Sequence, residues 1–590
     1  MKSKTLSNGF ALAAILVAAC AGSDPESIFE PTASVANRDE ALRFLGLPGT
    51  AELPVASTFT GTISSLQGTS QDGSSVPARY FLRQDNGEVL ELGKLATAAQ
   101  PATWLEQRVT VSGFRADHKV ATTDVQPLAQ LAAAAPAALT GARPFATLLC
   151  RFSDSTGVTP EAVPFFETLM SNSFPGMDHY WRQLSYNNIN LSGSRVFGWY
   201  NLPHERTFYV KAQPDGTKSL EANQLANDCF SVANADVDYR QFTGVNLMFN
   251  QDLDGPAWGG ASPMNFDGLG GAAISTTWMP TWAYHSQRTL GQEMGHTFAL
   301  KHSSGPYIDT YDSGWDVMSG GPCGVRDPIY GCVGVHTIAF HKDKLGWIPD
   351  ARKTVVGVGT TTFTLSRLAN PTTEGLLMIK IPLSADGNEF YTLEARRPQG
   401  YDSNIPHEGV LIHEVDLTRP DRTAQVVDTD NNSNANDLGA IWEVGETFID
   451  SAHGVTVQVQ SASASGFSVR VTLAGQLLTV SKVLSTGASG SVTSVPAGIN
   501  CGSDCSESYN VGQLISLKAI PGPFSVLTSW EGCDVSSATT CLVTMNNARS
   551  VRAYFGRIDP TCYQDCLADC REGGTPAGQC VGVCRDQCSN

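Results

Sequence analysis

The sequence has few charged residues and no cluster of basic ones. Charged residues make up 16% of the 590, and the formal net charge is −18. Binding to nucleic-acid phosphates requires grouped Lys and Arg, so nucleic acid is excluded as a partner. Hydrophobic residues reach 42%, and Gly (56) and Pro (31) are abundant. This balance excludes a largely disordered chain and favours an extracellular, turn-rich and mainly β protein.

No segment after the N-terminus reaches the roughly 18 consecutive apolar residues of a membrane-spanning helix, so we expect membrane attachment only through a lipid anchor. Residues 1–20 have the pattern of a secretory signal, because Lys2 and Lys4 precede the short apolar stretch Phe10–Ala19. The sequence Val17-Ala18-Ala19-Cys20 resembles a bacterial lipobox, which implies lipidation of Cys20. The alternative is ordinary signal cleavage nearby. Either way we expect export, to a bacterial cell surface or outer membrane as a lipoprotein, or as a secreted protein.

The length and the changes in pattern predict several domains. After a polar tether (21–57) with a short helix near Glu40–Leu45, residues 58–127 alternate as short strands and predict an OB-like β-barrel, which is a candidate prodomain. An Ala/Pro linker (128–144) leads to a mixed α+β region (145–350), with helices expected at Val163–Ser173 and Met177–Leu184. Residues 352–474 predict a β-sandwich. Residues 476–556 resemble the divergent internalin B-type repeat of bacterial surface proteins, and residues 560–590 form a Cys-rich end.

The chemistry is concentrated in the segment Thr289–His302. On a helix, Gln292 and His296 project from one face about one turn apart, and Glu293 lies beside them. His302 can join them only if the helix ends and the chain turns near Ala299. Three protein ligands with one open position are what a catalytic zinc site requires. We therefore predict that Gln292, His296 and His302 bind one Zn²⁺ and that Glu293 is the general base.

This segment is similar to the metzincin motif His-Glu-x-x-His-x-x-Gly-x-x-His at all but two positions. A second element, Tyr311–Ser319, looks like the Met-turn of that group and would place Met318 beneath the metal. The Gln-for-His variant is similar to members of the gametolysin family. The resemblance implies an α+β metzincin-like catalytic domain, flanked by all-β domains, that acts as a zinc-dependent metalloendopeptidase. Its substrates would be extracellular or cell-wall proteins bound in extended form.

Three departures from the motif have physical consequences. Gln292 replaces a His, and an amide oxygen is a weaker and harder donor than imidazole, so metal affinity would be lower or another ion preferred. Ala299 replaces a Gly, and a left-handed Ala costs about 1 kcal/mol. Gly320 stands where many metzincins have a Tyr, so help for the oxyanion must come from elsewhere or be absent. The alternative function is a catalytically inactive metzincin-like surface adhesin.

Several further sites are weaker candidates. His285 and His336 could line the cleft. Val245–Gly260 could be the edge strand that pairs with an extended substrate, and the N-terminal β domain could block the cleft until it is removed. Asp428–Asn434 has alternating oxygen donors that could bind Ca²⁺, although it lacks the Gly and distal Glu of a defined calcium loop and a solvated turn is the alternative.

The sequence contains 15 cysteines, and 14 remain once Cys20 is set aside. An even number is expected of an oxidised exported protein. The last six fall into two sets spaced four apart, which predicts two short antiparallel helices joined by three cross-links. Zinc binding by those thiols is the competing interpretation. The expected pairs are Cys150 with Cys229, Cys323 with Cys332, Cys501 with Cys505 and Cys533 with Cys541, and the helical set is Cys562, Cys566, Cys570, Cys580, Cys584 and Cys588.

Overall fold

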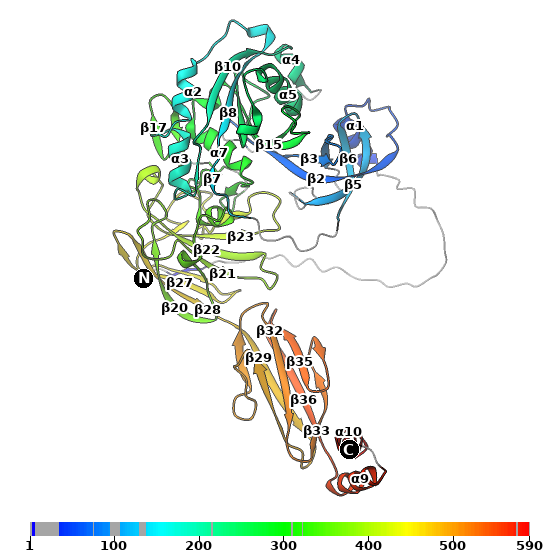
Figure 1. Ribbon diagram of the computed structural model, residues 1–590. Helices are drawn as coiled ribbons and strands as arrows, with labels where there is room; N and C mark the ends of the chain where they lie inside the picture. The colour runs from blue at the N-terminus through cyan, green and yellow to red at the C-terminus, as the bar shows by residue number, and fades with distance from the viewer. Residues whose placement is uncertain are drawn as a thin grey trace.

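The computed structural model describes residues 3–5, 35–72, 74, 76–94, 105, 107–128, 137–213, 216–307, 311–320, 323–573 and 576–588. The chain is multidomain and mostly β (Figure 1). A mixed α/β part and a small barrel lie at one end, a β-sandwich lies in the middle, and a β module with a helical hairpin lies at the other end. Within the described residues, no helix combines the length and the apolar composition needed to cross a membrane. Cys20 and most of the predicted signal peptide lie outside the described residues.

A ten-stranded sheet organises the first part of the molecule. Its first four strands run parallel, and β14 pairs antiparallel with β15. Beyond β14, the sheet continues directly into the N-terminal strands. In spatial order the strands are β10 (Arg195–Asn201), β8 (Phe145–Arg151), β13 (Gly244–Phe249), β15 (Ala272–Met279), β14 (Ala257–Met264), β2 (Ala56–Thr69), β3 (Arg79–Gln84), β4 (Val89–Lys94), β6 (Lys119–Pro127) and β5 (Arg108–Ala116).

The N-terminal strands form a barrel because β5 also pairs with β2. Helix α1 (Val35–Leu45) packs its Ala41 and Leu45 against Ala121 of β6, and it begins five residues before the expected short helix. Strand β2 is long enough to pair with β5 and β3 in the barrel and then, through its last three residues, with β14. The barrel and the α/β part therefore share one strand.

The helices of the α/β part pack on this sheet around an aromatic and methionine-rich core. Helix α3 coincides with its predicted range. Helix α2 is shorter than predicted, since the Ser-Asn-Ser run before Pro175 favours a turn over further helix. The elements are α2 (Val163–Leu169), α3 (Met177–Leu184), α4 (Arg206–Tyr209), α5 (Ala222–Ala233), α6 (Thr281–Tyr284), α7 (Gln287–Thr297) and α8 (Ala339–Lys344), with short strands β7 (Gly141–Ala142), β9 (Ile189–Asn190), β11 (Val210–Ala212), β12 (Lys218–Leu220), β17 (Val325–Asp327) and β18 (Gly331–Val333).

The middle of the chain contains two sheets that face each other over an apolar core. One includes β1 (Ser3–Thr5), which pairs parallel with β26. The other begins with β16 (Ser303–Ser304), the residues directly after His302, so the sandwich is tied to the α/β part. The sheets contain β1, β26 (Thr447–Asp450), β27 (Val455–Ser463), β28 (Gly466–Leu473) and β20 (Gly359–Ser366), and β16, β24 (Ala424–Val426), β23 (Gly409–Asp416), β22 (Glu389–Arg396), β21 (Met378–Pro382) and β19 (Lys353–Val355), with β25 (Ile441–Trp442) on β23.

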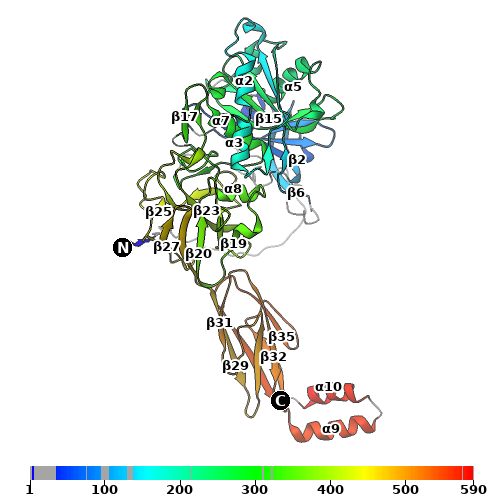
Figure 2. The ribbon, with the colours of Figure 1, turned by 60° about the vertical axis from the view of Figure 1, so that its left-hand side comes forward.

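The last part is a β module followed by a hairpin of helices α9 (Pro560–Glu572) and α10 (Ala577–Gln587), which lies at its far end (Figure 2). Two four-stranded sheets form the module: β31 (Ser506–Tyr509), β29 (Gln476–Leu484), β36 (Arg549–Arg557) and β33 (Ser525–Glu531), and β30 (Gly490–Val495), β32 (Leu514–Pro521), β35 (Thr540–Thr544) and β34 (Val535–Ser536).

The cysteines of the described residues form disulfides, as the even count predicted. The four predicted pairs outside the hairpin are all present, and the hairpin is closed by three bonds that link facing positions of α9 and α10. The six hairpin thiols are thus bonded to each other, which leaves none for the zinc interpretation. The bonds are Cys150–Cys229, Cys323–Cys332, Cys501–Cys505, Cys533–Cys541, Cys562–Cys588, Cys566–Cys584 and Cys570–Cys580.

Candidate metal centre

Helix α7 carries three of the four predicted site residues. The side chain of Ser286 caps its N-terminus by accepting from the Thr289 amide, and the helix ends at Thr297. Ala299 then adopts the left-handed region with φ 61°, and the Leu300 amide donates to the Gly295 carbonyl at 3.1 Å. This is the helix end and turn that the sequence predicted.

The turn brings His302 back against the helix. The ring centroids of His296 and His302 are 4.6 Å apart, with the planes at 80°. His296 Nδ1 lies 2.9 Å from the Leu300 carbonyl oxygen, and His302 Nδ1 lies 2.9 Å from Asp421 Oδ2. A proton on each Nδ1 leaves the lone pair on each Nε2, which is the form that binds a metal. Burial, and then the neighbouring His302, lowers the pKa of His296 to about 3, so that ring is neutral at pH 7.

The donor atoms of this cluster have no hydrogen-bond partner among the described residues. They are both side-chain polar atoms of Gln292, both carboxylate oxygens of Glu293, and His296 Nε2. Gln292, Glu293 and His302 are 0% exposed and His296 is 5% exposed. Buried polar groups without a partner cost roughly 1–3 kcal/mol each. One amide oxygen and two imidazole nitrogens are suitable ligands for Zn²⁺, so these residues fit a divalent ion.

Glu293 follows the proposed ligand Gln292 directly on α7. Burial raises its pKa to about 8, and the Thr69 hydroxyl partly opposes that shift. Thr69 belongs to β2, far from α7 in the sequence. A buried carboxylate with a raised pKa takes up a proton more readily than an exposed one, as a general base requires.

Tyr311 is a residue of the site that the sequence analysis did not single out. Its hydroxyl lies 3.5 Å from His302 Nε2 and donates to the carbonyl of Gly68. Burial, and then the charge of Glu293, raises the pKa of Tyr311, so the hydroxyl keeps its proton. At Gly320, a Cβ would lie 1.7 Å from the Tyr311 carbonyl oxygen. A larger residue at position 320 would displace the loop that holds Tyr311. Gly320 has no side chain to offer a hydroxyl, whereas the Tyr311 hydroxyl does lie beside His302.

Met318 packs directly against the site helix. A Cβ at Gly295 of α7 would lie 2.4 Å from Met318 Sδ, and Met318 is fully buried. The Met318 amide donates to Asp316 Oδ1 at 3.1 Å. The Asp316 carboxylate in turn lies 2.8 Å from His341 Nδ1 and accepts from Ser303 Oγ at 2.8 Å. Met318 is thus held in place against the helix that carries Gln292, Glu293 and His296.

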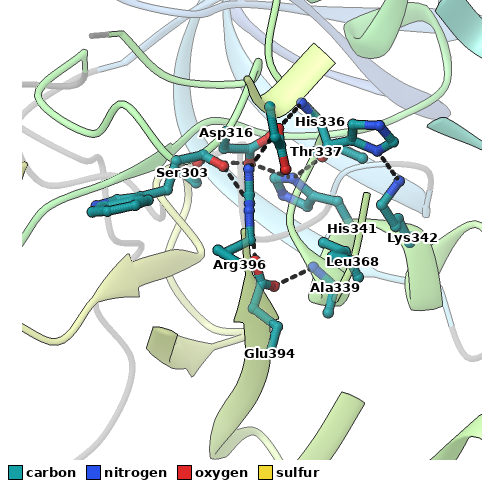
Figure 3. A network of polar contacts seen from close by, with 12 residues as sticks. Ser303, Asp316, His336, Thr337, Ala339, His341, Lys342, Leu368, Glu394 and Arg396 are labelled. Atoms are coloured by element: carbon teal, nitrogen blue, oxygen red, sulfur yellow. Dashed lines mark hydrogen bonds and ion pairs between the residues drawn. The ribbon is translucent and has the colours of Figure 1, made fainter. Parts of the chain in front are cut away.

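A buried polar network continues from Asp316 into the sandwich (Figure 3). Arg396 of β22 donates to the Trp315 carbonyl at 2.6 Å and forms ion pairs of 3.0 Å with Glu394 and Asp402. Burial alone would raise the pKa of Asp316, but the adjacent His341 holds it below its usual range. The sandwich therefore fixes the loop beneath the candidate metal centre.

The weaker candidates lie elsewhere. His285 Nε2 is 3.0 Å from Glu161 Oε1, and His336 is buried beside Lys342 in the network of Figure 3, so both satisfy structural contacts and neither joins the cluster. Within Val245–Gly260, residues 245–249 belong to the central strand β13 because its apolar side chains are buried on both faces. Only the part from Ala257 onwards belongs to β14, next to α7, and there β2 is its neighbour.

The predicted calcium loop contains one close group of carboxylates, of which Asp428 is buried, Asp437 is half-buried and Asp430 is exposed. Oxygens of Asp428, Asp430 and Asp437 lie within 4.8 Å of one another. Asp428 Oδ2 accepts from the Tyr307 hydroxyl at 2.8 Å, and Asp437 accepts from Asn432 and Asn434. The hydrogen bonds are those of a turn and the grouped carboxylates are suited to Ca²⁺, so both interpretations of the loop stay predictions, and neither adds a ligand to the α7 site.

The C-terminal β module resembles a known family. Residues 481–559 match the family model of the divergent InlB B-repeat domain. This confirms the resemblance expected for residues 476–556. No curated protein matches the chain.

Proposed function

We propose that this protein is an exported metal-dependent endopeptidase whose metal is bound by Gln292, His296 and His302. The observation that supports this most directly is the set of buried, unpartnered donor atoms on α7 and the turn after it. The helix end at Ala299, the Asp421 contact to His302 and the position of Met318 are consistent with a metzincin-like α+β domain of the gametolysin type.

The residues around this centre are suited to peptide hydrolysis. Gln292, His296 and His302 would hold Zn²⁺, which would act as a Lewis acid that activates water and polarises a carbonyl group. Glu293 accepts the proton of the attacking water and returns it to the leaving amine. The Tyr311 hydroxyl donates to the carbonyl oxygen as negative charge develops there. A polypeptide substrate would bind in extended form along β14, at the edge that Gln67–Thr69 of β2 pairs with in this structure, because a strand edge offers backbone donors and acceptors.

The second candidate function is a surface-binding protein that keeps the fold without catalysis. The InlB-type repeat at residues 481–559 favours attachment or adhesion at a cell surface, and the proposed lipid anchor at Cys20 fits both candidates. Glu293 favours the protease over the surface-binding protein, because catalysis requires a carboxylate beside the three potential ligands and adhesion does not.

The test is Glu293→Ala in the full chain. We expect zinc content to stay at one ion per chain, because Glu293 is not a ligand, and hydrolysis of extended peptides to fall by on the order of 10²-fold or more. Wild-type activity should disappear with a chelator and return with Zn²⁺. Glu161→Ala, whose carboxylate contacts His285 away from the cluster, is the matched control and should retain activity. Proteolysis that survives both Glu293→Ala and the chelator would rule the proposal out.

A further inference from the structure

The candidate metal centre is closed by the chain's own N-terminal strand. The last residues of β2 pair antiparallel with the edge of β14: Gln67 with Gly259, Gly68 with Trp258 and Thr69 with Ala257. At Gly259 the face of β14 packs directly on α7, since a Cβ there would be 2.2 Å from the Glu293 carbonyl oxygen. A segment paired with β14 at Gly259 therefore lies close to the helix that carries Glu293.

The contacts of this segment are those expected of a bound peptide. The Gly68 carbonyl accepts from the Tyr311 hydroxyl, which also lies 3.5 Å from His302 Nε2. The Gly68 carbonyl thus occupies the position that the proposed mechanism gives to a substrate carbonyl.

The pairing of Gln67–Thr69 with β14 helps to bury the candidate metal centre. All four predicted site residues are at most 5% exposed, so a substrate reaches them only during the fraction of time in which β2 leaves β14. Where β2 leaves β14, a cavity of about 630 Å³ opens, lined by residues that include Ser70, Val76, Asp254 and Trp258. Open space therefore adjoins the start of β14 at Trp258, next to the part that Gln67–Thr69 fills.

We propose that Gln67–Thr69 is a built-in competitive inhibitor: the N-terminal barrel holds these residues on β14 as a substrate-like strand for most of the time and so lowers the activity of the full chain without abolishing it. This inference rests on the proposed function. It also specifies the partner, because whatever replaces the segment must be a polypeptide that adds to β14 as an antiparallel strand. A small residue is favoured opposite Trp258, since a Cβ at Gly68 would lie 2.8 Å from that indole ring.

The test compares three full-length zinc-loaded proteins: wild type, Gly68→Leu and Gly49→Leu. Gly68→Leu forces the strand away from Trp258, whereas a Cβ at Gly49 meets nothing within 4 Å. The probe is a tripeptide hydroxamate, and the readouts are its Kd and hydrogen exchange of the amides of residues 257–259. If the segment fills the cleft at least 90% of the time, Gly68→Leu should bind the probe about tenfold tighter or more. Exchange at 257–259 should also be faster, and Gly49→Leu should match wild type.

A second variant acts in the opposite direction and keeps the barrel intact. Thr69→Cys with Ala257→Cys places thiols at register partners, a spacing that a disulfide can bridge. Oxidised, it should bind the probe more weakly than wild type, and mild reduction should restore the wild-type Kd, with reduced wild type as the control.

The outcomes are distinguishable. Equal probe affinity in all these proteins, with zinc bound and Glu293-dependent hydrolysis intact, overturns the inhibitor proposal and leaves the protease standing. A chain that cuts itself between Gly68 and Thr69 also overturns it, because the segment is then a substrate. Failure of every variant to bind zinc overturns both proposals.

Discussion

Asp421 is the residue whose role depends most on tertiary structure. It belongs to the sandwich region, 119 residues after His302, yet it contacts both the backbone amide and Nδ1 of that histidine. Burial alone would raise the pKa of Asp421, but the adjacent His302 holds it below its usual range. An ionised carboxylate on Nδ1 orients the ring and increases the basicity of Nε2.

Asp421→Asn should therefore weaken zinc binding by about 10–100-fold, as expected when the acceptor behind a ligating histidine is lost. Competition with a chromophoric chelator at pH 7 measures the affinity. Asp386→Asn, in an exposed turn that contacts only its neighbours, is the control and should leave the affinity unchanged. Identical affinities for the two variants would mean that Asp421 does not support a ligand.

Tyr311→Phe isolates the contribution of a single hydroxyl to the reaction. Because Tyr311 also binds the Gly68 carbonyl, the comparison belongs in the Gly68→Leu background, where that contact is already displaced. Loss of an oxyanion donor should lower kcat by on the order of 10²-fold while zinc content stays constant. Tyr307→Phe, which loses only a hydrogen bond to Asp428, should not change kcat. A fall in KM alone would contradict the assigned role.

At the scale of elements, a buried lysine of α8 attaches that helix to α3. Lys342 Nζ donates to the Leu184 carbonyl of α3 and lies 3.2 Å from His336 Nδ1. Burial lowers its pKa to about 7, against about 10.4 in an unfolded chain. Above pH 7 the unfolded chain binds a proton that the folded chain has released, so this group makes the free energy of unfolding rise with pH up to about 10.

Lys342→Met removes that titration. The difference in Tm, variant minus wild type, should become steadily more negative between about pH 7 and pH 9.5, because only the wild type gains stability over this range. Thermal unfolding at several pH values checks it, and Lys353→Met, a partly exposed lysine paired with Asp343, is the control. A pH-independent difference for Lys342→Met would show that its pKa is not lowered in the fold.

Local features of the site could be predicted from the sequence, and those supplied by distant segments could not. The helix face of Gln292 and His296 and the turn at Ala299 depend only on neighbouring residues, so spacing was sufficient. Pairing of β2 with β14 brings Thr69 to the cluster, and pairing of β16 with β24 brings Asp421 there. Tyr311 is placed by the close packing of its backbone against Gly320. No spacing in the chain indicates those pairings. The β2 strand was assigned to a separate barrel for the same reason.

At the scale of the whole molecule, the two C-terminal units differ in what holds them together. The InlB-type repeat encloses an apolar core that includes Val480, Ile515 and Val551. The hairpin of α9 and α10 buries mainly Leu567 and its own cystines. Helices of 13 and 11 residues are marginal by themselves in water, so the disulfides must stabilise the hairpin.

Reduction should therefore melt the hairpin and leave the repeat folded. Each of the three bonds closes a loop of 10 to 26 residues, and such a bond typically stabilises by about 2–4 kcal/mol. Hydrogen exchange in the reduced chain should become rapid across 560–587, while Leu514–Pro521 of β32 stays protected. The Cys501–Cys505 and Cys533–Cys541 bonds are reduced in the same sample and serve as an internal control, because the repeat keeps its apolar core without them. Protected hairpin amides after full reduction would mean that packing against the repeat, where Val526 and Ile558 contact Cys588, holds the helices instead.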